Sequence, residues 1–217
     1  MKNKERYFDL IEERPECFMQ SDSLKIILDK NAIEEFEKTS EREIGVIYES
    51  PYSILLVDLV ENSQGMKFTY ERIIPAIKDK AVVIVTIFQG KYVLLNQYRH
   101  SLRGYQYSFP RGYGEEGLSG EMNAKKEIKE EIGANIISIK QIGTIIADSG
   151  LSGNRVDVFV CDVENIQLKK GYEGIKEYQL FDKKELDCMI SRGIIDDGYT
   201  LAALTLFDKR ILRYSDE

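Results

Sequence analysis

The chain has 217 residues, 43% of them hydrophobic, which is enough for one large domain or for a core domain with an appendage. Its formal net charge of −7 excludes the basic surface typical of nucleic-acid-binding proteins, so we expect no nucleic-acid partner. The single histidine, His100, excludes a zinc site built on several histidines, and the three widely spaced cysteines are typical of reduced thiols.

Residues 1–75 are expected to form an N-terminal module. Their first 18 residues are too charged for a signal peptide, and no apolar run in the chain is long enough to span a membrane. We therefore expect a cytoplasmic protein without membrane association. Helical patterns lie around Tyr7–Glu13 and Ala32–Thr39. Three strands are expected to form a small antiparallel sheet, at Val46–Tyr48, Ser53–Val60 and Lys67–Ile74.

Residues 76–217 are expected to form one α/β (α+β) domain. Strands precede, flank and follow one central helix, which predicts a mixed sheet with helices on both sides. A glycine-rich loop at 112–120 leads into this helix, which Ser119 can cap and Gly133 can close after Ile132. The expected strands are Ala81–Phe88, Tyr92–Tyr98, Tyr105–Phe109, Ile136–Ile146, Arg155–Val163 and Glu177–Phe181, and the later helices are Lys183–Ser191 and Tyr199–Leu212.

The central helix ends in a cluster of acidic residues. Glu127, Glu130 and Glu131 stand at i, i+3 and i+4, where they share one helix face and repel one another. Such a cluster is expected to have a partner, and oxygen-rich sites suit Mg²⁺, Mn²⁺ or Ca²⁺. The alternative is a solvated helix face on which these carboxylates pair with Lys126 and Lys129.

The loop and helix together resemble the Nudix box of the Nudix hydrolases. That pattern is Gly, five residues, Glu, seven residues, Arg-Glu, an aliphatic residue, any residue, Glu-Glu, any residue, Gly and an aliphatic residue. The spacing is intact here, but Leu118 replaces the first Glu and Lys126 replaces the Arg. The matching positions are Gly112, Glu127, Ile128, Glu130, Glu131, Gly133 and Ala134.

Three further segments resemble the ADP-ribose pyrophosphatase subgroup of this family. They are Asn-Gln-Tyr-Arg at 96–99, Tyr-Ser-Phe-Pro-Arg-Gly at 107–112, and the stretch 193–204. The resemblance covers roughly residues 45–212. It implies a Nudix-like mixed sheet sandwiched between helices, with an N-terminal antiparallel β module.

The resemblance also implies a set of metal ligands. Glu127 and Glu131 are expected to bind the metal directly, and the backbone carbonyl of Arg111 completes the set. Glu130 is expected to bind the metal or to hold one of its ligands. The expected ion is Mg²⁺, with Mn²⁺ as the alternative.

On the substrate side, the resemblance implies that Arg99 contacts a phosphate or the terminal ribose. Arg111, which stands where the subgroup often has Ala, is expected beside the substrate. Glu173 matches the loop carboxylate that assists the attacking water, with Glu177 as the alternative. From the residues alone, a surface salt bridge for Arg99 and an ordinary exposed loop acid for Glu173 also stay open. Lys126 keeps the charge of the family's arginine but lacks its bidentate fork, which predicts looser positioning of the catalytic glutamates.

The implied activity is Mg²⁺-dependent hydrolysis of the diphosphate bond of a nucleoside diphosphate derivative. ADP-ribose or a related nucleotide sugar is the expected substrate, and ADP-ribose would give AMP and a sugar phosphate. Two alternatives stay open: a catalytically weak or silent nucleotide-sugar-binding protein, and a hydrolase of another Nudix substrate class, such as dinucleotide polyphosphates. The resemblance further implies a homodimer that exchanges the N-terminal sheet.

Overall fold

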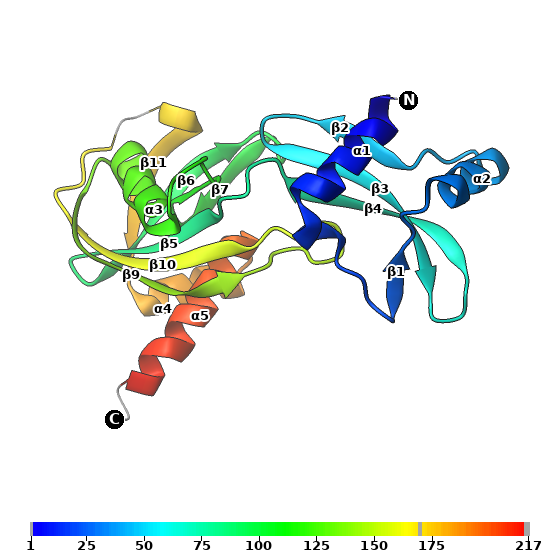
Figure 1. Ribbon diagram of the computed structural model, residues 1–217. Coiled ribbons are helices and arrows are strands. Elements are labelled where there is room, and N and C mark those ends of the chain that lie inside the picture. Colours follow the sequence, from blue (N-terminus) through cyan, green and yellow to red (C-terminus); the bar gives the residue numbers. More distant parts are fainter. Residues whose placement is uncertain (1, 169–170, 215–217) are drawn as a thin grey trace. The chain divides into compact units, whose positions relative to one another are not determined.

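The computed structural model describes residues 2–168 and 171–214, which form two compact units. The first unit comprises Met1–Ile77 together with the short segment Asp148–Asn154, and the second comprises Lys78–Ala147 with Arg155–Glu217. Figure 1 shows the elements of each unit. No helix among the described residues has the length and apolar character needed to cross a membrane.

The N-terminal unit is an antiparallel sheet with two helices. The central strand β3 pairs with β1 near its end and with β2 near its start, so these two share one edge, while β4 pairs along the other edge. This confirms the three expected strands and both helices, and it adds the short strand β1. The elements are α1 (Lys2–Glu13), β1 (Leu24–Ile26), α2 (Lys30–Ser40), β2 (Gly45–Glu49), β3 (Ser53–Asn62) and β4 (Lys67–Pro75).

A buried aspartate of the sheet binds Tyr7 of helix α1 and pairs with Arg72 of the neighbouring strand β4. Asp58 on β3 is only 2% exposed. It accepts hydrogen bonds from the Tyr7 hydroxyl and from Nε of Arg72, each at 2.5 Å. Burial of the carboxylate is tolerated because both of its oxygens have donors.

The second unit contains a seven-stranded mixed sheet. Its order is β11-β6-β5-β10-β9, and β7 and β8 pair with β6 and β5. Only β5 and β10 run parallel; the other pairs are antiparallel. The strands are β5 (Ala81–Phe88), β6 (Lys91–Arg99), β7 (Gly104–Ser108), β8 (Arg111–Gly112), β9 (Asn135–Ile145), β10 (Val156–Glu164) and β11 (Ile175–Phe181); the helices are α3 (Gly120–Glu127), α4 (Lys183–Ser191) and α5 (Gly198–Tyr214).

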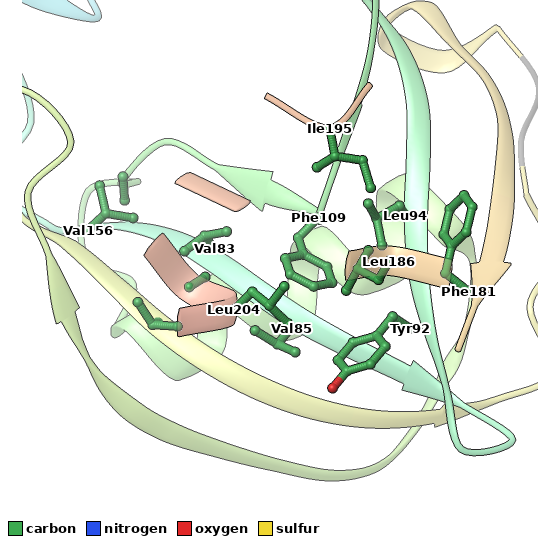
Figure 2. Packing of buried hydrophobic residues seen from close by; sticks show 13 residues of the cluster. Val83, Val85, Tyr92, Leu94, Phe109, Val156, Phe181, Leu186, Ile195 and Leu204 are labelled. Atoms are coloured by element: carbon green, nitrogen blue, oxygen red, sulfur yellow. The ribbon is translucent and has the colours of Figure 1, made fainter. Parts of the chain in front are cut away.

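Helices cover both faces of this sheet, as the strand pattern predicts. Because side chains alternate along a strand, Val83 and Val85 of β5 point to one face, where they join Leu186 of α4 and Leu204 of α5 (Figure 2). Their neighbours Val82 and Ile84 point to the other face and join a separate cluster with the helix α3 residues Ala124 and Ile128. The expected α/β class with a mixed sheet between helices is confirmed.

The structure differs from the expectation where the glycine-rich loop begins. Gly112 does not start a loop but belongs to the two-residue strand β8, which pairs with Val82 and Val83 of β5. A strand this short contains no alternation from which it could be predicted. The expected central helix is also not uniform, since its last turn, Ile128–Ile132, is π-helical.

Candidate metal and active site

The acidic helix begins and ends where its sequence predicts. The Ser119 side chain accepts a hydrogen bond from the Met122 backbone amide at 3.3 Å, which caps the start of α3. Gly133 adopts a φ of 62° and ends the π-helical turn. The apolar face of this helix packs on the sheet. This packing fixes the direction in which the glutamate side chains between the apolar residues point.

Two of the three glutamates of the acidic cluster are buried beneath strand β8. The backbone N–H of Arg111 donates to Oε2 of Glu131 at 3.1 Å. A Cβ on Gly112 would lie 1.8 Å from Oε1 of Glu127. A side chain at position 112 would therefore displace the Glu127 carboxylate, and glycine lets the backbone of β8 pass this close to it.

The two buried carboxyl groups have raised pKa values. Glu127 is 9% exposed and Glu131 is 1% exposed. Burial raises the pKa of Glu127 to about 7; Lys126 opposes the shift, and Glu130 and Glu173 add to it. Burial is the larger cause and repulsion from Glu127 the second of the raised pKa of Glu131, which is about 8. A pair of buried, mutually repelling carboxylates calls for a compensating positive charge.

This arrangement fits a hard divalent cation. Among the described residues, no three Asp, Glu, His or Cys side chains form a ready-made metal site. The expected ligand set has only two carboxylates, Glu127 and Glu131, and takes its third ligand from the backbone of Arg111. The two buried carboxylates lie directly against β8, and their oxygens are the ligand type that Mg²⁺ and Mn²⁺ prefer.

Arg99 is a partly buried cation near this pair. Its Nη2 donates to the Ser108 hydroxyl at 2.8 Å, while its buried Nε has no hydrogen-bond partner within the described part of the chain. It forms no ion pair with any residue that the structure describes, so the surface salt bridge is not observed. Burial, together with the nearby Arg111, lowers the pKa of Arg99. A cation held this way retains donors for an anionic ligand.

Arg111 is held by a residue whose role the sequence analysis missed. Its Nη1 donates to Oδ1 of Asp197 at 2.9 Å, and its guanidinium lies 4.9 Å from the Tyr199 ring centre. Oδ2 of Asp197 accepts from the Thr200 amide and hydroxyl at 2.9 and 2.8 Å. An Asp three positions before a Thr at the start of a helix is a local capping signal. The pairing with Arg111 has no such signal, because Arg111 is 86 positions away in the sequence.

Glu173 belongs to a turn next to strand β11. Its side chain is exposed, and its charge contributes to the raised pKa of both Glu127 and Glu131. The alternative base, Glu177, accepts hydrogen bonds from Asn96 at 3.4 Å and from Gln179 at 3.2 Å. Glu173 thus lies close enough to Glu127 and Glu131 to raise their pKa values, whereas Glu177 is hydrogen-bonded to side chains of the sheet.

Comparison with known proteins bears on the fold of the chain. No family model matches the chain. A solved structure described as an ADP compounds hydrolase has a TM-score of 0.67 and 18% identity, covering 79% of this chain and 93% of that one. The chain has a Nudix fold. The ADP compounds hydrolase NudE of Escherichia coli (strain K12) is 34% identical over 82 residues, which are 38% of this chain and 43% of the relative. The aligned region thus spans less than half of that relative. The chain is similar to ADP compounds hydrolases, in sequence over this region and in fold over most of its length.

Lys126, which replaces the arginine of the Nudix box, pairs with two carboxylates in the structure. Nζ of Lys126 lies 3.1 Å from Oε2 of Glu130, one turn later on the same helix. It also pairs with Glu115 of the preceding loop. A solvated face paired with lysine therefore describes Glu130 but not the buried Glu127 and Glu131. One lysine joins the glycine-rich loop to the end of the acidic helix.

Proposed function

We propose that this protein hydrolyses the diphosphate bond of nucleoside diphosphate derivatives in a Mg²⁺-dependent reaction. ADP-ribose or a related nucleotide sugar is the proposed substrate, and ADP-ribose would yield AMP and a sugar phosphate. One observation carries the proposal: Glu127 and Glu131 are buried together against strand β8 with raised pKa values. When both groups are ionised, a positive charge placed between them offsets their burial and their mutual repulsion.

The proposed metal ligands are Glu127, Glu131 and the backbone carbonyl of Arg111. When bound there, Mg²⁺, or Mn²⁺ in its place, neutralises diphosphate charge and lowers the pKa of a bound water. The protein contributes the fixed geometry. Gly112 lets β8 approach the helix, and the Arg111 amide orients the Glu131 carboxylate.

The remaining groups bind substrate and move the proton. Arg99 and Arg111 present guanidinium groups to phosphate oxygens. Glu173 accepts the proton of the attacking water as the water oxygen bonds to phosphorus and the bond to the bridging oxygen breaks. Lys126 holds Glu130 at the edge of the buried pair. In this assignment each charged group has one task, and no histidine or cysteine is needed.

We also propose that the protein is a homodimer in which the N-terminal unit is exchanged between subunits. Support comes from large apolar side chains that this unit exposes, among them Met19, Ile47, Tyr48 and Met66. Sedimentation equilibrium tests this proposal: a dimer is expected, and a monomer at micromolar concentration would contradict it.

The activity is tested with purified protein, Mg²⁺ and a panel of compounds comprising ADP-ribose, ADP-sugars, NADH and dinucleotide polyphosphates. We expect turnover of at least one nucleotide sugar that stops when the metal is chelated. Absence of Mg²⁺-dependent turnover of every member would contradict the proposal. Tight binding without turnover would instead support the silent binding protein, for which the substitutions Leu118 and Lys126 in the box are the motivating observation.

A further inference from the structure

Gln97 connects the central sheet to the turn that carries Glu173. Gln97 is the seventh residue of β6 and is 4% exposed. Its Nε2 donates a hydrogen bond to the backbone carbonyl of Glu173 at 3.0 Å. β6 pairs with β11 on one side and with β7 on the other, so Gln97 sits on a rigid support.

The turn that receives this bond is conformationally restricted. Glu173 has φ 46° and ψ 32°, a left-handed conformation that is unfavourable for residues other than glycine. Gly171 and Gly174 on either side have φ values of 81° and 77°. The Gly171 amide donates to the Ile175 carbonyl at 2.9 Å and closes the turn. Outside contacts are needed to hold a non-glycine residue in this state.

Stability alone does not account for a glutamine at position 97. Because Nε2 faces the Glu173 carbonyl, the orientation of the amide is fixed, and its Oε1 is buried without a hydrogen-bond partner among the described residues. A buried acceptor without a hydrogen-bond partner lowers the stability of the folded protein. An apolar side chain of similar length would avoid that cost but would leave the turn without its donor.

We propose that Gln97 is a positioning residue for Glu173. Its amide fixes the Glu173 peptide in the left-handed conformation and thereby directs the carboxylate toward the side of the site where Glu127 and Glu131 lie. The inference rests on the proposed function, in which Glu173 is the base. It predicts that loss of the Gln97 donor weakens catalysis through Glu173 and through no other group.

The kinetic test uses Gln97→Met, which keeps the length of the side chain and removes the donor. We expect kcat to fall about tenfold or more with KM changed less than about twofold, since misplacing a reacting group lowers the chemical step. In a Glu173→Gln background the same substitution should lower kcat no further. An equal loss in both backgrounds would overturn the inference. The matched control is Gln20→Met, which removes a glutamine bond to the Ile26 carbonyl in the N-terminal unit and should leave kcat unchanged.

A second measurement does not depend on activity. Hydrogen–deuterium exchange of peptides covering 171–177 should be faster in Gln97→Met than in wild type, and unchanged in Gln20→Met. Unchanged exchange would overturn the inference even if the protein proves active. If the wild-type protein shows no turnover, the proposed function fails, while exchange still decides whether Gln97 holds the turn. Should Gln97→Met not fold, Gln97→Leu serves instead, because it also removes the donor to the Glu173 carbonyl, and the same exchange result is expected.

Discussion

The backbone amide of Arg111 donates a hydrogen bond to Oε2 of Glu131, while the Arg111 side chain pairs with Asp197 at 2.9 Å. One residue of a two-residue strand therefore joins the acidic helix to the start of helix α5. Glu131 is 1% exposed and Asp197 is 5% exposed, so both contacts are sheltered from water. Strand β8 fixes the candidate metal ligands and one candidate substrate cation together.

The substitution Glu131→Gln should abolish stabilisation by Mg²⁺ without destabilising the metal-free protein. It removes one of two repelling buried carboxylates, so the metal-free variant should be at least as stable as the wild type. The increase in melting temperature that Mg²⁺ gives the wild type should be absent from the variant, because a ligand is missing. Thermal unfolding with Mg²⁺ and with chelator measures both effects. Glu121→Gln, on the exposed side of the same helix, should retain the full Mg²⁺ response.

The stability of the metal-free protein should depend on pH. The folded-state pKa values of Glu127 and Glu131, about 7 and about 8, lie above the ordinary value of 4.5. The folded state therefore binds protons more tightly than the unfolded state, and the free energy of unfolding should fall as pH rises from about 4.5 to about 8. Denaturant titration in chelator at pH 5, 6.5 and 8 measures this. A stability that rises across that interval and does not respond to Glu131→Gln would contradict the raised pKa values.

The two roles of Asp197 can be separated by two substitutions. Asp197→Asn keeps an oxygen that can accept from Thr200 but loses the charge that pairs with Arg111. Asp197→Ala loses both. We expect the alanine variant to lose about 3–5 kcal/mol of stability, since it leaves a partly buried cation unpaired and uncaps α5. The asparagine variant should lose less stability but still show a raised KM for the nucleotide substrate. Urea unfolding and steady-state kinetics measure the two effects, and an unchanged KM in both variants would contradict the substrate-side role of Arg111.

Lys126 should matter for catalysis more than for stability. Its side chain is about one-third exposed, so losing its pairs with Glu115 and Glu130 should cost less than about 1 kcal/mol. Lys126→Met should nevertheless lower kcat several-fold because Glu130 is no longer held. Lys126→Arg should match or exceed the wild-type rate, since a bidentate fork holds a carboxylate more firmly.

The matched control for this experiment is Lys125→Met. Lys125 pairs with Glu121 on the same helix but on an exposed position away from the buried glutamates. Its loss should leave kcat unchanged. Equal effects of the two methionine variants would show that Lys126 has no specific role in the site.

The sequence predicts most of this fold because its signals are local. The almost entirely apolar strand Ala81–Phe88 and the Asp182-capped helix Lys183–Ser191 have the bounds that the pattern indicates. The Ser119 cap and the Gly133 stop of the acidic helix are equally local. Strands β1 and β8 escaped prediction because two or three residues cannot show a period of two.

The site is less predictable because its contacts join distant parts of the chain. Nothing local marks Asp197 as the partner of Arg111 or Gln97 as the donor to Glu173, 76 positions later. The acidic cluster could be located from its spacing. That Glu127 and Glu131 are buried while Glu130 stays at the rim depends on how strand β8 crosses the helix, which only the folded structure defines.

The most direct test of the account is product analysis of ADP-ribose incubated with Mg²⁺ and wild-type, Glu131→Gln or Glu121→Gln protein. We predict stoichiometric AMP and sugar phosphate from wild-type and Glu121→Gln protein, with a rate at least a hundredfold lower for Glu131→Gln. ADP-ribose cleavage at an equal rate by Glu131→Gln would contradict the assignment of the buried glutamate pair as the metal site.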